Sequence, residues 1–125
     1  MLQVLQELGA GRKRTHWMWF VFPQLRALGQ SPTAKRYGVA SLDEARAYTG
    51  HPVLGPRLIL CTDLVLATRQ QTLHDIFGSP DDMKFRSSMT LFSRSSPTTP
   101  SFASALQQFC GGESDPKTVA LLAEG

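Results

Sequence analysis

The sequence predicts an all-α protein, a compact irregular bundle of about six to seven short helices in a single domain. Three observations lead to this class. Apolar residues recur every three to four positions in most segments, as on the buried face of a helix. Prolines stand at the starts of these segments and glycines at their ends, the usual helix signals. The 125 residues are enough for one domain with one core.

The first quarter of the chain combines a short helix with an aromatic block. Leucines at helical spacing predict a helix over residues 2–8, which the glycines that follow bring to an end. Residues 12–22 are predicted to form a helix or an aromatic turn, with a second short helix beginning at Pro23. A strand over residues 17–22 is the alternative, because aromatic residues favour strands, but no strand-like run lies nearby to pair with it.

The remaining helices are predicted from caps and apolar stripes. Ser41 begins a capping box for a helix over residues 42–49. The segment 54–69 is apolar on nearly every side, which predicts the central helix of the core. Ser79 is predicted to cap a helix that has Pro80 at its first position. Further helices are predicted over residues 73–77, 80–93, 100–110 and 116–123.

Charge is unevenly distributed along the chain. The net charge is +3, but residues 1–62 hold eight Lys/Arg and three Asp/Glu, whereas residues 63–125 hold five and seven. A positive first half suits an anionic ligand. The alternative is that the two halves attract each other within the fold.

Several classes of function lack support in the sequence. No apolar run approaches the roughly 20 residues of a membrane helix, and residues 1–8 do not resemble a signal peptide, so we expect a cytoplasmic protein without a membrane partner. Cys61 and Cys110 are predicted as core residues rather than as a disulfide or metal site. No cofactor motif or glycine-rich phosphate loop is present. Three clustered cations without a reader motif make nucleic acid an improbable partner.

The aromatic block supplies the first candidate binding residues. It joins consecutive cations to a histidine, both tryptophans and a proline. Lysine binds phosphate or carboxylate, histidine can exchange protons near neutral pH, and an indole can stack on a planar ring. The alternative is a solvated basic turn that leads into core aromatics. The ligand-binding candidates of this block are Lys13, His16, Trp17, Trp19 and Gln24, and His16 is also a catalytic candidate.

A second polar group occupies residues 81–90. Lys84, Ser87 and Ser88 share neighbouring helix faces, so a lysine one turn from two hydroxyls could hold a phosphate or carboxylate. Lys84 and Ser88 are also catalytic candidates, because an amine can activate a hydroxyl. The alternative is an amphipathic helix whose small serines permit close packing. Asp81 and Asp82 are interpreted as favourable charges in the first turn of the helix.

Two hypotheses follow. In the first, both groups line one cleft for an anionic, nucleotide-like small molecule, and the protein is a ligand-binding protein or an enzyme. In the second, exposed aromatic residues form a surface for a protein partner. The sequence gives no indication of an oligomeric state.

Four long motifs stand in order along the chain: KRTHWMWFVFPQL (13–25), SLDEARAY (41–48), HPVLGPRL (51–58) and IFGSPDDMKFRSSMTLF (76–92). Together they resemble the signature of the family called domain of unknown function 1810, and the resemblance extends over about residues 2–122. The resemblance implies an all-helical, mostly bacterial, cytoplasmic protein, and supplies no reaction. Some members are labelled calpastatin, although nothing here resembles calpastatin's inhibitory repeats. Members usually begin with a further helical segment with a Phe-x-x-Ala-Gln-like motif, which we expect this chain to lack.

Overall fold

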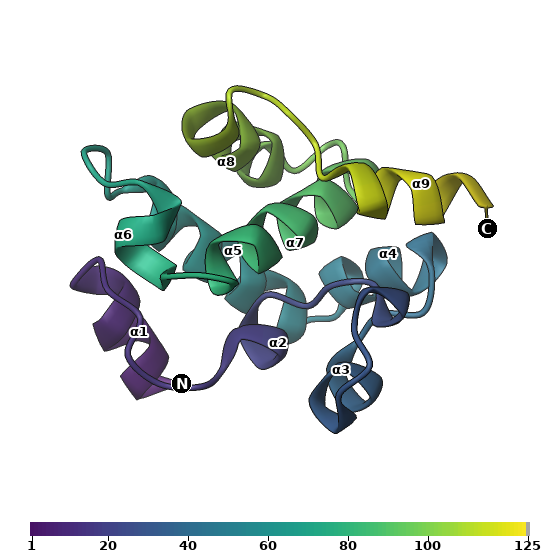
Figure 1. Cartoon of the computed structure of the whole chain (residues 1–125), viewed down its shortest axis with the longest axis horizontal. Coiled ribbons are helices and arrows are strands. Elements are labelled where there is room, and N and C mark those ends of the chain that lie inside the picture. The colour runs from purple at the N-terminus through teal and green to yellow at the C-terminus, as the bar shows by residue number, and fades with distance from the viewer. Residues whose placement is uncertain (125) are drawn as a thin grey trace.

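The computed structural model describes residues 1–124 and confirms an all-α single domain, with nine α-helices, one 3-10 helix and no strand in this part of the chain (Figure 1). None of these helices is long and apolar enough to cross a lipid bilayer. The helices are α1 (Leu2–Gly9), α2 (Met18–Val21), η1 (Arg26–Leu28), α3 (Pro32–Tyr37), α4 (Leu42–Gly50), α5 (Leu54–Leu66), α6 (Leu73–Phe77), α7 (Asp81–Ser95), α8 (Pro100–Cys110) and α9 (Pro116–Glu124).

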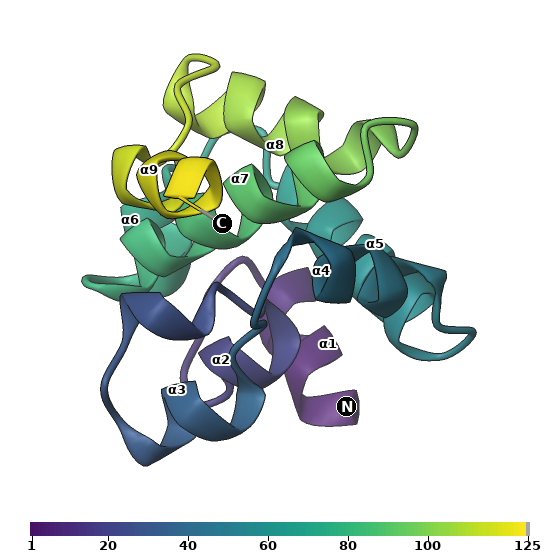
Figure 2. The ribbon, with the colours of Figure 1, turned by 90° about the vertical axis from the view of Figure 1, so that its right-hand side faces the viewer.

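Helix α7 is the central element of the bundle. It packs against α2, α4, α6, α8 and α9, and Figure 2 shows it between α8 and α9 on one side and α2 and α4 on the other. Helix α5, which lies in the segment predicted to be central, packs against α1, α4 and α8. Both helices contribute fully buried side chains to one continuous core.

The central position of α7 is hard to recognise because many of its buried side chains are hydroxylic. The hydroxyl of Ser87 donates to the carbonyl of Met83 at 3.1 Å, and that of Thr90 donates to the carbonyl of Arg86 at 2.9 Å. A buried hydroxyl that bonds to the preceding helical turn leaves no unsatisfied donor. Small hydroxylic residues can therefore face the core, and the sequence of a central helix such as α7 need not be strongly apolar.

The helix predicted from Pro23 is wrong. The backbone of Gln24 accepts from Val39, and Arg26 donates to the carbonyl of Val39, each at 2.8 Å, which forms an isolated parallel bridge between Leu25 and Val39. This pairing uses the backbone groups that a helix would need, so η1 begins only at Arg26.

The start of α7 also differs from the prediction. Pro80 is the N-cap residue of α7, without a side-chain cap, and the helix begins at Asp81. Ser79 therefore does not cap it. By contrast, the predicted cap at Ser41 is present, since its hydroxyl accepts from the backbone of Glu44 at 3.2 Å.

A tight corner joins α4 to α5. The imidazole Nδ1 of His51 accepts from the backbone amides of Val53 and Leu54 at 3.1 and 3.2 Å. Gly55, in the first turn of α5, lies directly against the carbonyl oxygen of Thr49. The absence of a side chain at Gly55 therefore sets how closely the two helices approach.

We predict that Gly55→Ala lowers the free energy of unfolding by about 1–3 kcal/mol, because the added methyl group overlaps a backbone atom that has little room to move. Gly50→Ala is the matched control: its methyl group meets no atom within 4 Å, and alanine favours a helix by up to about 1 kcal/mol over glycine. Urea unfolding followed by circular dichroism measures both. Equal stability of the two variants would contradict the close approach.

Candidate functional site

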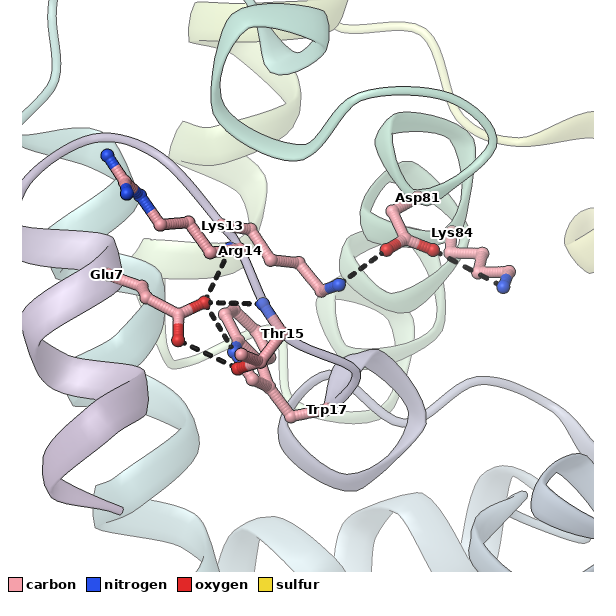
Figure 3. A network of polar contacts seen from close by, with 7 residues as sticks. All are labelled: Glu7, Lys13, Arg14, Thr15, Trp17, Asp81 and Lys84. Atoms are coloured by element: carbon pink, nitrogen blue, oxygen red, sulfur yellow. Dashed lines mark hydrogen bonds and ion pairs between the residues drawn. The ribbon is translucent and has the colours of Figure 1, made fainter.

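The carboxylate of Glu7 organises the loop that carries the first group of candidate residues (Figure 3). One oxygen, Oε1, accepts from the backbone amides of Arg14 and Thr15 at 2.6 and 3.0 Å. The same oxygen accepts from the indole Nε1 of Trp17 at 3.0 Å, while Oε2 accepts from the Thr15 hydroxyl at 2.8 Å. Glu7 thus replaces the internal hydrogen bonds that this irregular segment lacks.

The environment of Glu7 keeps the carboxylate charged. Only 7% of the residue is exposed, and burial alone would raise the pKa of Glu7. The hydrogen bonds from Arg14, Thr15 and Trp17 outweigh burial and lower the pKa from 4.5 to about 2. Glu7 is therefore ionised throughout the neutral range, and its bonds are charge-assisted.

Asp81 holds two lysines together at the start of α7. Its Oδ2 lies 2.8 Å from Lys13 Nζ, and its Oδ1 lies 3.3 Å from Lys84 Nζ. Burial raises the pKa of Asp81, but the two ammonium groups bring it below its ordinary value. Lys13 is further fixed by its backbone amide, which donates to the carbonyl of Ile76 at 2.6 Å, and its Nζ lies 5.2 Å from the centroid of the Trp17 ring.

These groups border a cavity of about 520 Å³, a volume typical of small-molecule sites. The loop after α1, the turn of α2, the helix α3 and the first turn of α7 all border this cavity. Its lining residues are Lys13, His16, Trp17, Met18, Trp19, Phe20, Ser31, Thr33, Tyr37, Asp81 and Lys84. We call this cavity the lysine cleft.

Five of the predicted ligand-binding residues line the lysine cleft: Lys13, His16, Trp17, Trp19 and Lys84. Gln24, Ser87 and Ser88 do not. Ser87 and Ser88 are 7% and 0% exposed, because they lie on the core side of α7, and Gln24 is 3% exposed. The Ser88 hydroxyl and the Gln24 side-chain nitrogen are buried without a hydrogen-bond partner in the described structure. The lysine-and-hydroxyl cradle expected from the spacing is therefore not formed in the cleft.

The exposed aromatic surface of the lysine cleft comes from residues that the sequence did not single out. Trp17 and Trp19 are each only 8% exposed, whereas Phe20 and Tyr37 are 40% and 37% exposed. The latter two rings meet edge to face, with centroids 5.6 Å apart and an interplanar angle of 86°. Tyr37 lies on α3, far from the aromatic block in sequence, so only the fold reveals this pair.

Glu7 was missed by the analysis of the sequence, although one signal marks it. It is the only acidic residue before Asp43, and it stands beside Leu8 in an apolar helix. Glu7 also follows Val4 by three positions, so it shares the buried face of the helix, and a buried carboxylate needs hydrogen-bond donors.

The two cysteines do not supply a reactive group. Cys61 is buried, as predicted, while Cys110 is partly buried, and both thiols are free. Burial raises the pKa of both, that of Cys61 to about 11, so neither is a reactive thiolate. Among residues 1–124, no three His, Cys, Asp or Glu side chains lie close enough to hold a metal ion.

We predict that the free energy of unfolding decreases as the pH is lowered and Glu7 becomes protonated. Because its pKa is lowered on folding, its contribution is present above pH 4.5 and is lost as the pH falls toward 2. Glu7→Gln should lower the free energy of unfolding at pH 7 by about 2 kcal/mol. The variant should also lose less stability than the wild type between pH 6 and 3.

Urea unfolding at several pH values measures both effects. Glu124→Gln is the control, since it removes an exposed carboxylate. A Glu7→Gln variant as stable as this control at pH 7 would show that the charge on Glu7 does not hold the loop.

Comparison with known proteins places the chain in a family. A solved structure, that of the conserved hypothetical protein Rv1873 from Mycobacterium tuberculosis, is 56% identical to this chain, with a TM-score of 0.95, and the match covers 98% of this chain and 87% of that one. No curated protein matches. The model of a family described as protein of unknown function (DUF1810) matches residues 1–122. The chain therefore belongs to the DUF1810 family.

Proposed function

We propose that the lysine cleft binds a small anionic molecule with a planar part, such as a nucleotide. The observation that carries this proposal is the presence of Lys13, His16 and Lys84 around one concave cavity that also has exposed aromatic rings. Lysine and protonated histidine attract phosphate or carboxylate groups. A cavity with a few convergent polar groups is the usual form of a small-molecule site.

The two lysines have different parts in this proposal. The side chain of Lys13 is 7% exposed and that of Lys84 is 34% exposed, and both contact Asp81. An incoming anion would compete with Asp81 more easily for Lys84, whose ion pair is longer and more exposed to solvent. Lys13 then supplies a fixed positive charge at the base of the cleft, and Lys84 supplies the contact that closes on the ligand.

The planar part of the ligand would stack on Tyr37, since the ring of Phe20 is nearly perpendicular to that of Tyr37, at 86°, and one plane can lie flat on only one of the two. Base–aromatic stacking contributes roughly 1–3 kcal/mol and tolerates different bases, because every base has a π face. The hydroxyls of Ser31 and Thr33 line the same cavity and can donate hydrogen bonds to polar edges of the ligand. The ligand class is therefore a phosphorylated or carboxylated aromatic molecule of the cytoplasm, where the sequence predicts the protein to reside.

If the cleft is also an active site, His16 is the group suited to proton transfer, since it is exposed and lines the cavity. If the protein instead used this surface to bind a protein partner, we would expect a flat aromatic patch with Lys84 free in solvent. The cavity is instead concave, and Lys84 contacts Asp81, which favours a small ligand.

We predict that a bound nucleotide or sugar phosphate raises the melting temperature, because a ligand of the folded state stabilises it by mass action. At a concentration of about 100 times Kd, the rise should be roughly 10 °C for a chain of this size. Lys84→Ala should reduce the rise, while Lys117→Ala, which removes an exposed lysine on α9, should not. A thermal-shift screen of nucleotides and sugar phosphates measures this. No shift across the panel, or an equal shift in both variants, would refute the cleft as an anion site.

A second prediction separates the aromatic part of the cleft from its charged part. Tyr37→Leu should lower the affinity for nucleotides by about five- to a hundredfold, because a stacking surface is lost. The affinity for a ring-free sugar phosphate should not change. Titration calorimetry with one ligand of each kind gives the two values. An equal loss for both ligands would indicate damage to the fold of the cleft rather than lost stacking.

A further inference from the structure

A second cavity, of about 320 Å³, shares one wall with the lysine cleft. The shared wall is formed by Trp19, Phe20 and Tyr37. Beyond this wall the charged lining changes from lysine to arginine, with three arginines and one acid. The arginines are Arg26, Arg36 and Arg57, and the acid is Glu44. We call this cavity the arginine pocket.

The fold has a specific device that brings Arg26 and Arg36 together. The bridge between Leu25 and Val39 pins the start of η1 beside the end of α3. At Gly38 the two segments are so close that an added Cβ would lie 2.6 Å from the Cα of Arg26 and would also overlap the carbonyl of Ala34. A side chain at position 38 would push the segments apart. The two arginines therefore lie together because of the backbone rather than through flexible side chains alone.

The third arginine comes from α5, next to the corner with α4, and its guanidinium lies 4.6 Å from the centroid of the Phe20 ring. Arg36 lies similarly over Tyr37, at 5.4 Å. A cation over the face of an aromatic ring is attracted by the ring's electrons. Each ring thus helps to hold one arginine at the pocket.

None of these arginines has a carboxylate partner within residues 1–124. The ion pairs of arginine there involve Arg46 and Arg86 instead. Arg26 donates to the carbonyl of Gly38 at 3.2 Å, which satisfies a donor without neutralising the charge. Guanidinium groups stay ionised at any ordinary pH, so three positive charges meet only one negative charge in the arginine pocket.

A neutral donor completes the lining. Burial raises the pKa of Tyr48, which Arg57 lowers only in part, so the phenol keeps its proton at neutral pH. A phenol O–H and several guanidinium N–H groups are hydrogen-bond donors suited to the oxygens of phosphate or carboxylate.

We propose that the arginine pocket is a second anion site, which binds a phosphate or carboxylate group through Arg26, Arg36 and Arg57. The argument is independent of the proposed function of the lysine cleft, since it rests on unpaired arginines on the other side of the shared wall. Because both cavities meet at Phe20 and Tyr37, a molecule with an anionic group at each end of a planar part is the class that fills both.

Titration calorimetry with inorganic pyrophosphate tests this site on the whole protein. Arg36→Met and Arg57→Met keep an unbranched apolar stem and remove the charge. Each should lower the affinity for pyrophosphate about tenfold or more, since hydrogen bonds to charged groups are stronger than those between neutral groups. Arg94→Met, an exposed arginine at the end of α7, and Lys117→Ala, an exposed lysine on α9, should leave the affinity unchanged. Lys84→Ala reports separately on any pyrophosphate that binds in the lysine cleft. A parallel titration with citrate shows whether carboxylates bind at the same arginines.

Three results would overturn the proposal: no binding of either anion by the wild type, equal affinity in both arginine variants and the wild type, or a loss caused by Lys84→Ala but not by the arginine variants. The third result would assign the anion to the lysine cleft and leave the proposed function standing. Arg36 is exposed, so Arg36→Met should keep the wild-type melting temperature and remain informative if Arg57→Met unfolds.

Discussion

The buried carboxylate of Glu7 is the interaction on which the candidate site depends. It lies near the end of α1, which is anchored by Val4 and Leu8 in the core. Through four hydrogen bonds it fixes the path of residues 14–17, a segment with no helix of its own. A carboxylate serves here because it accepts several bonds at once. The packing of α1 is thereby coupled to the direction in which Lys13 and the indole of Trp17 extend.

Lys13 connects this loop to α7 through its ion pair with Asp81. An ammonium group with so little exposure needs a partner, because burying an unpaired charge is costly, and Asp81 provides it at 2.8 Å. The same carboxylate contacts Lys84, so one acid from the second half of the chain positions a cation from each half. Figure 3 shows the two systems side by side, with Glu7 bonded to the loop and Asp81 between the lysines. Contacts within the protein therefore hold the charged lining of the cleft in place.

Local signals account for what the sequence predicted well. The cap at Ser41 and the glycines after α6 and α8 act within a few residues of the helix ends, so these helix limits could be predicted from the sequence. The bridge between Leu25 and Val39 joins residues whose pairing no local pattern encodes. The same holds for Tyr37, which reaches the cleft only through the fold. Ser87 and Ser88 were assigned to a ligand site, but both lie on the core side of α7, because the polar pattern of residues 81–90 does not show which hydroxyls face the core. The Ser87 hydroxyl bonds to the carbonyl of Met83, whereas that of Ser88 has no partner in the described structure.

The charge asymmetry of the chain has a structural explanation. If the two halves were held together by their opposite charges, the cations of residues 1–62 would be paired with acids of residues 63–124. The described structure has one such ion pair between lysine or arginine and an acid, that of Lys13 with Asp81, and pairs Arg46 with Asp43 inside the first half. Arg26, Arg36 and Arg57 instead line one pocket that contains a single acid, Glu44, and none of the three forms an ion pair within residues 1–124. Cations that are not neutralised by nearby acids raise the local electrostatic potential, so ion pairs between the two halves do not explain the uneven charge of the chain.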